Sequence, residues 1–167
     1  FLNECRFVGV RDKVSLEIAE AIAPSANVEL SFDLAPLMLE TENFELVSVE
    51  RKGIAVCLCP KERLAGDLAA EKNRLEKIAS SLDAIQGLTG EMIYFVDFNG
   101  HQDLGDRAIH QEVASYLSES TRYQMVDYDA NPYRVLQRMA SYKLAISMRL
   151  HASVFGFLTE TPVYILC

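Results

Sequence analysis

The chain has 167 residues, half of them hydrophobic, and its 16 Lys and Arg against 24 Asp and Glu give a formal net charge of −8. This length suits one globular domain with a real core, and 8 Gly and 5 Pro are too few for a fibrous or disordered chain. No apolar run reaches the roughly 18 residues that a membrane-spanning helix needs. The acidic balance argues against a nucleic-acid partner, which requires a basic face, but it allows a local basic pocket.

The two ends of the sequence suggest a piece of a longer protein. The first residue is Phe1 rather than Met, and Cys167 closes the strand-like run 162–167. No signal peptide is visible, although a fragment would not show one that had been removed. We therefore expect residues 1–167 to form a single domain that belongs to a longer chain.

The four cysteines favour a reducing compartment. Cys57 and Cys59 are separated by one residue inside an apolar run, and neither a C-x-x-C pair nor a histidine stands at zinc-binding spacing. Buried free thiols are the simplest interpretation of these residues. The sequence thus predicts no metal site and a cytoplasmic location.

Short apolar runs alternate with amphipathic stretches along nearly the whole chain. The runs predict strands at 6–10, 28–30, 53–59, 92–96, 123–126, 144–148 and 163–166. The stretches predict helices at 15–22, 67–86, 106–117, from 131 onward and at 149–157. This alternation predicts an α/β fold, a Rossmann-like parallel sheet with helices on both faces and right-handed crossovers.

Individual helices carry more specific expectations. Ser15 is predicted to cap the first helix, and Leu68 to begin the inward-facing stripe of the second. His110 lies among polar residues and is expected at the surface. Asn131 as a cap and Pro132 at the first helical position mark the start of a further helix.

Charged and imidazole side chains follow several of the predicted strands. Because ligands of open parallel sheets bind beyond the carboxyl ends of the strands, these residues are expected near one edge. They are Arg11, Asp12 and Ser15 after the first strand, Asp33 after the second, Asp97, Asn99, His101 and Asp103 after the fourth, and Arg149 and His151 after the sixth.

The segment 147–156 gives the sharpest prediction, because a strand runs directly into a helix there. Arg149 and His151 stand in the first turn, where unpaired N–H groups and the helix dipole attract anions. The guanidinium adds a planar fork that suits phosphate or carboxylate, and the imidazole can donate to an anion or move a proton. The sequence therefore predicts an anion site, without naming the ligand.

Several known site motifs are absent from the sequence. It contains neither the G-x-G-x-x-G nor the P-loop pattern, and no G-x-S-x-G nucleophile. Asp97, Asp103 and Asp106 follow no metal-ligand spacing, so helix capping and loop turns are the favoured roles for these carboxylates.

Three segments resemble the polysaccharide pyruvyl transferase family. They are 10–15, which reads Val-Arg-Asp-Lys-Val-Ser, then 32–35 with Asp33, and 147–152 with Arg149-Leu150-His151 followed by 161–163. The loop at 98–103, with His101 and Asp103, also looks like a family loop. The resemblance covers nearly the whole chain in the same order.

The resemblance implies a two-domain fold similar to GT-B glycosyltransferases, roughly twice as long as this chain, so that the chain would be the C-terminal, donor-binding half. Its missing N-terminal domain would be a partner, and the fragment alone is expected to be inactive. The family moves the pyruvyl group of phosphoenolpyruvate onto two hydroxyls of a sugar, which forms a cyclic ketal in exopolysaccharides or cell-wall glycans.

The resemblance also implies roles for individual residues. Arg11, Arg149, Leu150 through its backbone N–H, and His151 would bind phosphoenolpyruvate, which serves as donor substrate without a cofactor. His151 is the candidate catalytic residue, either for proton transfer or for phosphate stabilisation. Asp33 could activate an acceptor hydroxyl or hold its loop, and Ser15, His101 and Asp103 are further candidates. The acceptor would be a glycan or lipid-linked saccharide, met in the cytoplasm or at the inner face of the membrane.

Two alternatives remain open at this point. The same architecture could bind a nucleotide sugar, as GT-B glycosyltransferases do, although Glu112 and Asp129 are poor candidates for gripping a ribose. The domain could instead be non-catalytic and bind an anionic polymer or a protein.

Overall fold

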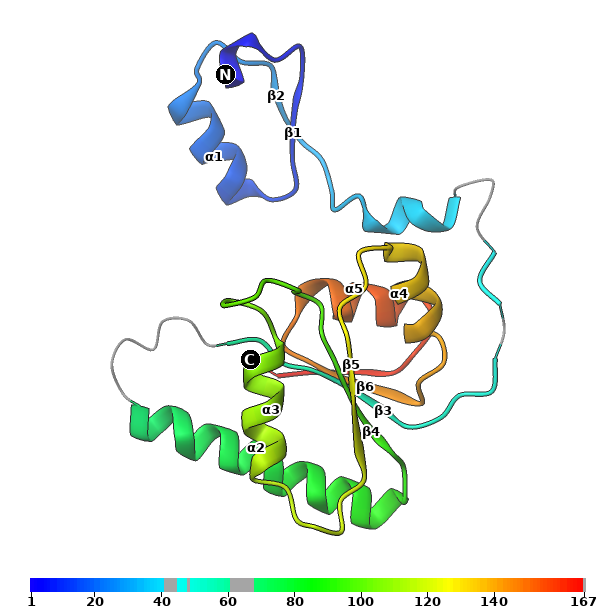
Figure 1. Ribbon diagram of the computed structural model, residues 1–167. Helices are drawn as coiled ribbons and strands as arrows, with labels where there is room; N and C mark the ends of the chain where they lie inside the picture. The colour runs from blue at the N-terminus through cyan, green and yellow to red at the C-terminus, as the bar shows by residue number, and fades with distance from the viewer. Residues whose placement is uncertain (41–44, 48, 61–67, 167) are drawn as a thin grey trace. The chain divides into compact units, whose positions relative to one another are not determined.

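The computed structural model describes residues 1–40, 45–47, 49–60 and 68–166. The chain divides into two compact units, Phe1–Met38 and Leu39–Cys167 (Figure 1). That they together make one domain over 1–167 stays a prediction.

The first unit is a short β-α-β element. A 3-10 turn, η1 (Leu2–Glu4), precedes strand β1 (Val8–Val10), helix α1 (Lys13–Ile22) and strand β2 (Val28–Leu30). The two strands pair in parallel, with Val8 opposite Val28. A second 3-10 segment, η2 (Ala35–Glu40), follows.

The N-cap of α1 is Asp12 and not Ser15, so the capping prediction was wrong by three residues. The Asp12 carboxylate accepts the backbone N–H of Ser15 at 2.8 Å and its hydroxyl at 2.9 Å. A carboxylate is also favoured at this end of a helix by the helix dipole. These two bonds from Ser15 hold the pKa of Asp12 below its usual value.

The second unit contains a five-stranded parallel sheet in the order β5-β4-β3-β6-β7. Its strands are β3 (Ile54–Cys57), β4 (Ile93–Val96), β5 (Tyr123–Val126), β6 (Leu144–Ser147) and β7 (Val163–Ile165). Ile54 pairs with Ile93 on one side and with Leu144 on the other, so β3 is the central strand. All four residues of β3 are buried, as its continuous apolar run predicts.

Helices cover both faces of this sheet, which confirms the predicted α/β class (Figure 1). Helices α2 (Leu68–Thr89) and α3 (Arg107–Ser115) connect β3, β4 and β5 and pack against each other. Helices α4 (Pro132–Met139) and α5 (Leu150–Leu158) connect β5, β6 and β7 and form the other pair. The crossovers run in opposite directions along the sheet in the two pairs, so right-handed connections put the pairs on opposite faces.

The main core lies between the sheet and the α2/α3 pair. Its members come from alternate positions of the strands and from one stripe of each helix: Ile54, Val56, Leu58, Leu75, Ala79, Leu82, Ile93, Phe95, Ile109, Val113, Ala114 and Ile146. Leu68, predicted to begin the α2 stripe, is instead 85% exposed because it lies at the first turn of the helix, before the stripe reaches the sheet.

Most predicted boundaries agree with the structure within a few residues. Asn131 caps α4 through the backbone N–H groups of Tyr133 and Arg134, with Pro132 at the first position, as predicted. The predicted start of the second helix at Asp67 and the terminal Cys167 lie outside the described residues. Among the described helices, none is both long and apolar enough to cross a membrane.

Candidate functional site

The order of the strands marks one place where a ligand would bind. The chain leaves β3 toward β4 and β5, then returns to β6 on the opposite side of β3. In open parallel sheets, the crevice at such a reversal, beyond the carboxyl ends of the strands, is the usual ligand site. Arg149, Leu150 and His151 follow β6 directly and therefore stand at this reversal.

Arg149 is the N-cap residue of α5 and has an extended backbone, with φ −90° and ψ 126°. Its side chain makes no capping bond, so it supplies no acceptor to the first-turn N–H groups. Its backbone is held instead by Ser147, whose hydroxyl accepts the Arg149 N–H at 3.0 Å and donates to the Arg149 carbonyl at 2.8 Å. The strand-to-helix junction is thus fixed by its own local bonds.

The guanidinium of Arg149 is paired with Asp106, which is 43 positions earlier in the chain. Nε donates to both carboxylate oxygens, at 3.0 and 3.2 Å, and Nη2 donates to Oδ1. The Asp106 side chain is fully buried, whereas Arg149 is 27% exposed. Nη1 has no hydrogen-bond acceptor among the described residues and is the part of the fork left for a ligand.

Asp106 also organises the loop between β4 and α3. Its Oδ2 accepts the backbone N–H groups of Phe98 and Asn99, each at 2.9 Å. The Phe98 ring meets Phe155 of α5 edge to face, with 6.0 Å between centroids. One ion pair and one aromatic contact therefore connect this loop to the helix that carries Arg149.

The candidate residues His101 and Asp103 lie in this loop. His101 Nδ1 accepts the backbone N–H groups of Asp103 and Leu104, both at 3.1 Å, so the proton of the neutral ring is on Nε2. Both candidates are exposed. The loop folds tightly on itself at Gly105, where an added Cβ would lie 2.2 Å from the His101 carbonyl oxygen.

Leu150 and His151 occupy the first turn of α5, and both are exposed. The following residue, Ala152, is fully buried and seats this turn on the sheet. The structure thus gives the Arg-Leu-His segment an anchored backbone with side chains that solvent or a ligand can reach.

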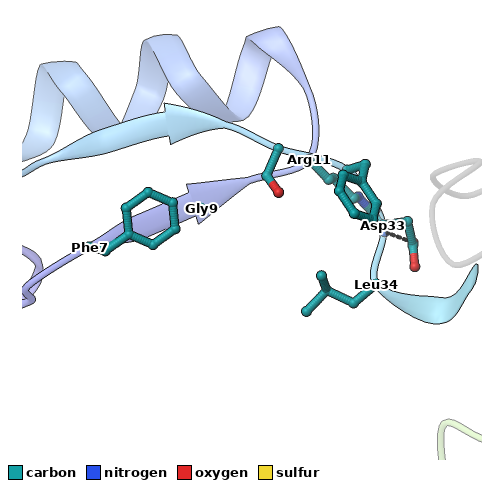
Figure 2. Close-up of a pocket in the computed structure, with 7 residues that line it drawn as sticks. Phe7, Gly9, Arg11, Asp33 and Leu34 are labelled. Carbon is teal, nitrogen blue, oxygen red and sulfur yellow. Dashed lines mark hydrogen bonds and ion pairs between the residues drawn. The ribbon is translucent and has the colours of Figure 1, made fainter. Parts of the chain in front are cut away.

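The remaining candidates lie in the first unit, at the carboxyl ends of β1 and β2. Arg11 Nη1 lies 3.4 Å from Asp33 Oδ2, and the Arg11 side chain is 53% exposed (Figure 2). The other Asp33 oxygen accepts the Ala35 N–H at 3.0 Å, which closes a turn. An ion pair this long and exposed is weak, so an anionic ligand can compete for Arg11.

An open pocket of about 450 Å³ surrounds this pair. Phe7, just before β1, and Gly9 within this strand line the pocket, and Leu34 lies beyond the strand ends beside Asp33 (Figure 2). Ser15 is committed to Asp12 through its hydroxyl. The structure therefore brings Arg11 to Asp33 in one unit, and Arg149 to the loop of His101 and Asp103 in the other.

Sequence reasoning missed a buried network beneath the carboxyl ends of β3 and β4. His110, expected at the surface, is fully buried: Nδ1 lies 2.7 Å from Asp97 Oδ1, and Nε2 accepts the Leu58 N–H at 3.0 Å. Arg107 Nε donates to the second Asp97 oxygen at 2.8 Å, and the guanidinium reaches Asp127 as well. The network ties the ends of three neighbouring strands together.

Cys57 lies near this network and is completely buried. Burial raises the pKa of its thiol, and the carboxylates of Asp106 and Asp97 raise it further. A thiol held protonated in this way is a poor nucleophile, so its role is packing, as the sequence indicates.

The comparisons with known proteins concern the chain as a whole. A family model described as polysaccharide pyruvyl transferase matches residues 1–166. A search of curated proteins finds no significant match.

Proposed function

Because the chain belongs to the polysaccharide pyruvyl transferase family, we propose that it binds phosphoenolpyruvate and serves the transfer of its pyruvyl group to a sugar diol. The observation that carries the proposal is Arg149. This arginine stands at the N-terminus of α5, at the reversal of strand order, and the buried carboxylate of Asp106 fixes its guanidinium.

Phosphoenolpyruvate carries a phosphate and a carboxylate close together, which calls for two cationic partners. We propose that Arg149 and the first-turn N–H of Leu150 bind one anionic group of the donor, and that Arg11, within the first unit, is a separate candidate for anion binding. The long and exposed contact between Arg11 and Asp33 supports this role, because little is lost when the guanidinium turns to a ligand.

The proposed reaction begins with a proton added to the methylene carbon of the enol, which leaves an oxocarbenium-like centre at C2. One sugar hydroxyl attacks C2, the bond from C2 to the phosphate oxygen breaks, and inorganic phosphate leaves. The second hydroxyl then closes the ketal, and both hydroxyls lose their protons. His151 would supply the methylene proton or stabilise the phosphate. Asp33 is a separate candidate, within the first unit, for accepting a hydroxyl proton.

Further parts of the proposal concern the whole protein. We place the chain in the donor-binding half of a two-domain, GT-B-like enzyme that acts on a glycan or lipid-linked saccharide of exopolysaccharide or cell-wall biosynthesis. Cys5, Cys57 and Cys59 are free thiols, which supports a reducing compartment such as the cytoplasm.

The direct test is pyruvyl transfer by the complete enzyme and its Arg149→Ala variant, followed as phosphate release. We expect transfer to fall about 100-fold or more, because the charge-assisted contact with the donor anion is lost. The variant also leaves the buried Asp106 carboxylate without its counter-ion, so its melting temperature should fall, and transfer is compared at a temperature at which circular dichroism shows both proteins folded. Arg134→Ala is the matched control, since that arginine pairs with Asp129 in a more exposed position at the start of α4. Equal transfer by the Arg149 and Arg134 variants would remove Arg149 from the site.

A further inference from the structure

We propose that Asp106 is a positioning residue that aims the Arg149 guanidinium at the donor anion. This inference rests on the proposed function and adds to it a residue outside the Arg-Leu-His segment. It concerns how the arginine is held before any ligand arrives.

Asp106 is saturated with donors and fully buried. It accepts two backbone N–H groups from the loop at Phe98 and Asn99, and the Nε and Nη2 groups of Arg149. A buried carboxylate with four donors cannot rotate without breaking several bonds, so its orientation is set by the loop and by α3.

The geometry of the pair leaves one side of the guanidinium for a ligand. Asp106 takes the Nε and Nη2 edge of the fork. The planar guanidinium keeps further N–H groups on Nη1, which has no acceptor among the described residues. Arg149 therefore meets its ligand with a side chain that has already lost its rotational freedom, which lowers the entropy cost of binding.

The carboxylate has two opposing effects on an anionic ligand. Its charge offsets that of Arg149 and would weaken anion binding, whereas its hydrogen bonds orient the arginine and would strengthen it. The bidentate geometry and the complete burial of Asp106 favour orientation as the larger effect. The sign of the change on Asp106→Asn separates the two.

The experiment is calorimetric titration of phosphoenolpyruvate into the complete enzyme and into Asp106→Asn, Arg149→Ala and the double variant. We expect each single variant to bind at least about 10-fold more weakly, and the double variant to bind no more weakly than Arg149→Ala. Asp129→Asn is the matched control, since Asp129 also accepts a backbone N–H and pairs with two arginines. The affinity of this variant for phosphoenolpyruvate should equal that of the wild type.

The outcomes distinguish this inference from the proposed function. If Arg149→Ala binds phosphoenolpyruvate like the wild type, the proposed donor site fails. If Arg149→Ala binds phosphoenolpyruvate weakly but Asp106→Asn binds it normally or more tightly, only the positioning role is overturned. The positioning role is also overturned if the losses of binding free energy in the two single variants add up in the double variant. Should Asp106→Asn not fold, Arg149→Lys replaces it: the lysine keeps the charge but not the two-point pairing, and wild-type affinity in that variant would also refute the positioning role.

Discussion

Replacement of His110 by alanine tests the buried network beneath the candidate site. The imidazole is fully buried, accepts the Leu58 N–H, bonds to Asp97, and packs near the Phe95 ring with 5.3 Å between centroids. The variant removes one partner from each of two buried polar groups and leaves a cavity among core side chains.

The expected cost follows from these losses. The Leu58 N–H loses the His110 Nε2 acceptor, which costs about 1 to 3 kcal/mol, and an unfilled cavity of this size adds about 2 kcal/mol. Asp97 keeps its bond to Arg107, so its charge is not left without a counter-ion. We therefore expect His110→Ala to lower the free energy of unfolding by about 3 to 5 kcal/mol.

The assay is urea unfolding followed by circular dichroism, together with hydrogen exchange at the Leu58 amide. His101→Ala is the control, because this exposed histidine makes its hydrogen bonds within its own loop in the described part of the chain, and its variant should lose no more than about 1 kcal/mol. Equal losses of unfolding free energy in the two variants, or an unchanged exchange rate at Leu58, would show that the buried contacts of His110 do not stabilise this unit.

Two further predictions concern stability. Hydrogen bonds from Lys143 and from the Gly53 N–H lower the pKa of Glu91 below 4.5, so its stabilising effect is present above that pH and is lost as pH falls through the lower folded value. In urea unfolding between pH 3 and 6, Glu91→Gln should therefore lose less unfolding free energy toward acid than the wild type. If the unfolding free energies of the two proteins fall in parallel with pH, the pair of Glu91 with Lys143 does not stabilise the fold. Gly87→Ala meets no atom within 4 Å inside α2 and should raise stability by about 0.5 to 1 kcal/mol. In Gly105→Ala the new Cβ meets backbone oxygen atoms, so the melting temperature should fall. A melting temperature that rises in Gly105→Ala as it does in Gly87→Ala would show that the loop at Gly105 is not tightly folded.

The fold was predictable because its signals are local. The run at 53–59 is apolar throughout, as a strand buried on both faces requires, and it forms the fully buried β3. Asn131-Pro132 marked the start of α4 correctly. The predicted cap of α1 was wrong because Asp12 and Ser15 are both good capping residues. Only the extended backbone conformation of Asp12 distinguishes the two.

The roles of Asp106 and His110 were not predictable from local pattern. Their partners, Arg149 and Leu58, are 43 and 52 positions away, and only the fold brings them together. One signal was present: positions 106, 109, 110 and 113 share one face of α3, and Ile109 and Val113 are buried on it. A polar residue within an apolar helical stripe therefore pointed to a buried partner rather than to the surface.

The proposed function requires that the chain recognise phosphoenolpyruvate through Arg149. The most direct measurement is calorimetric titration of the complete enzyme with phosphoenolpyruvate and, separately, with a uridine diphosphate sugar. We expect saturable binding of phosphoenolpyruvate that Arg149→Ala weakens, and no binding of the nucleotide sugar. Binding of the nucleotide sugar alone would contradict this expectation and would favour a glycosyltransferase.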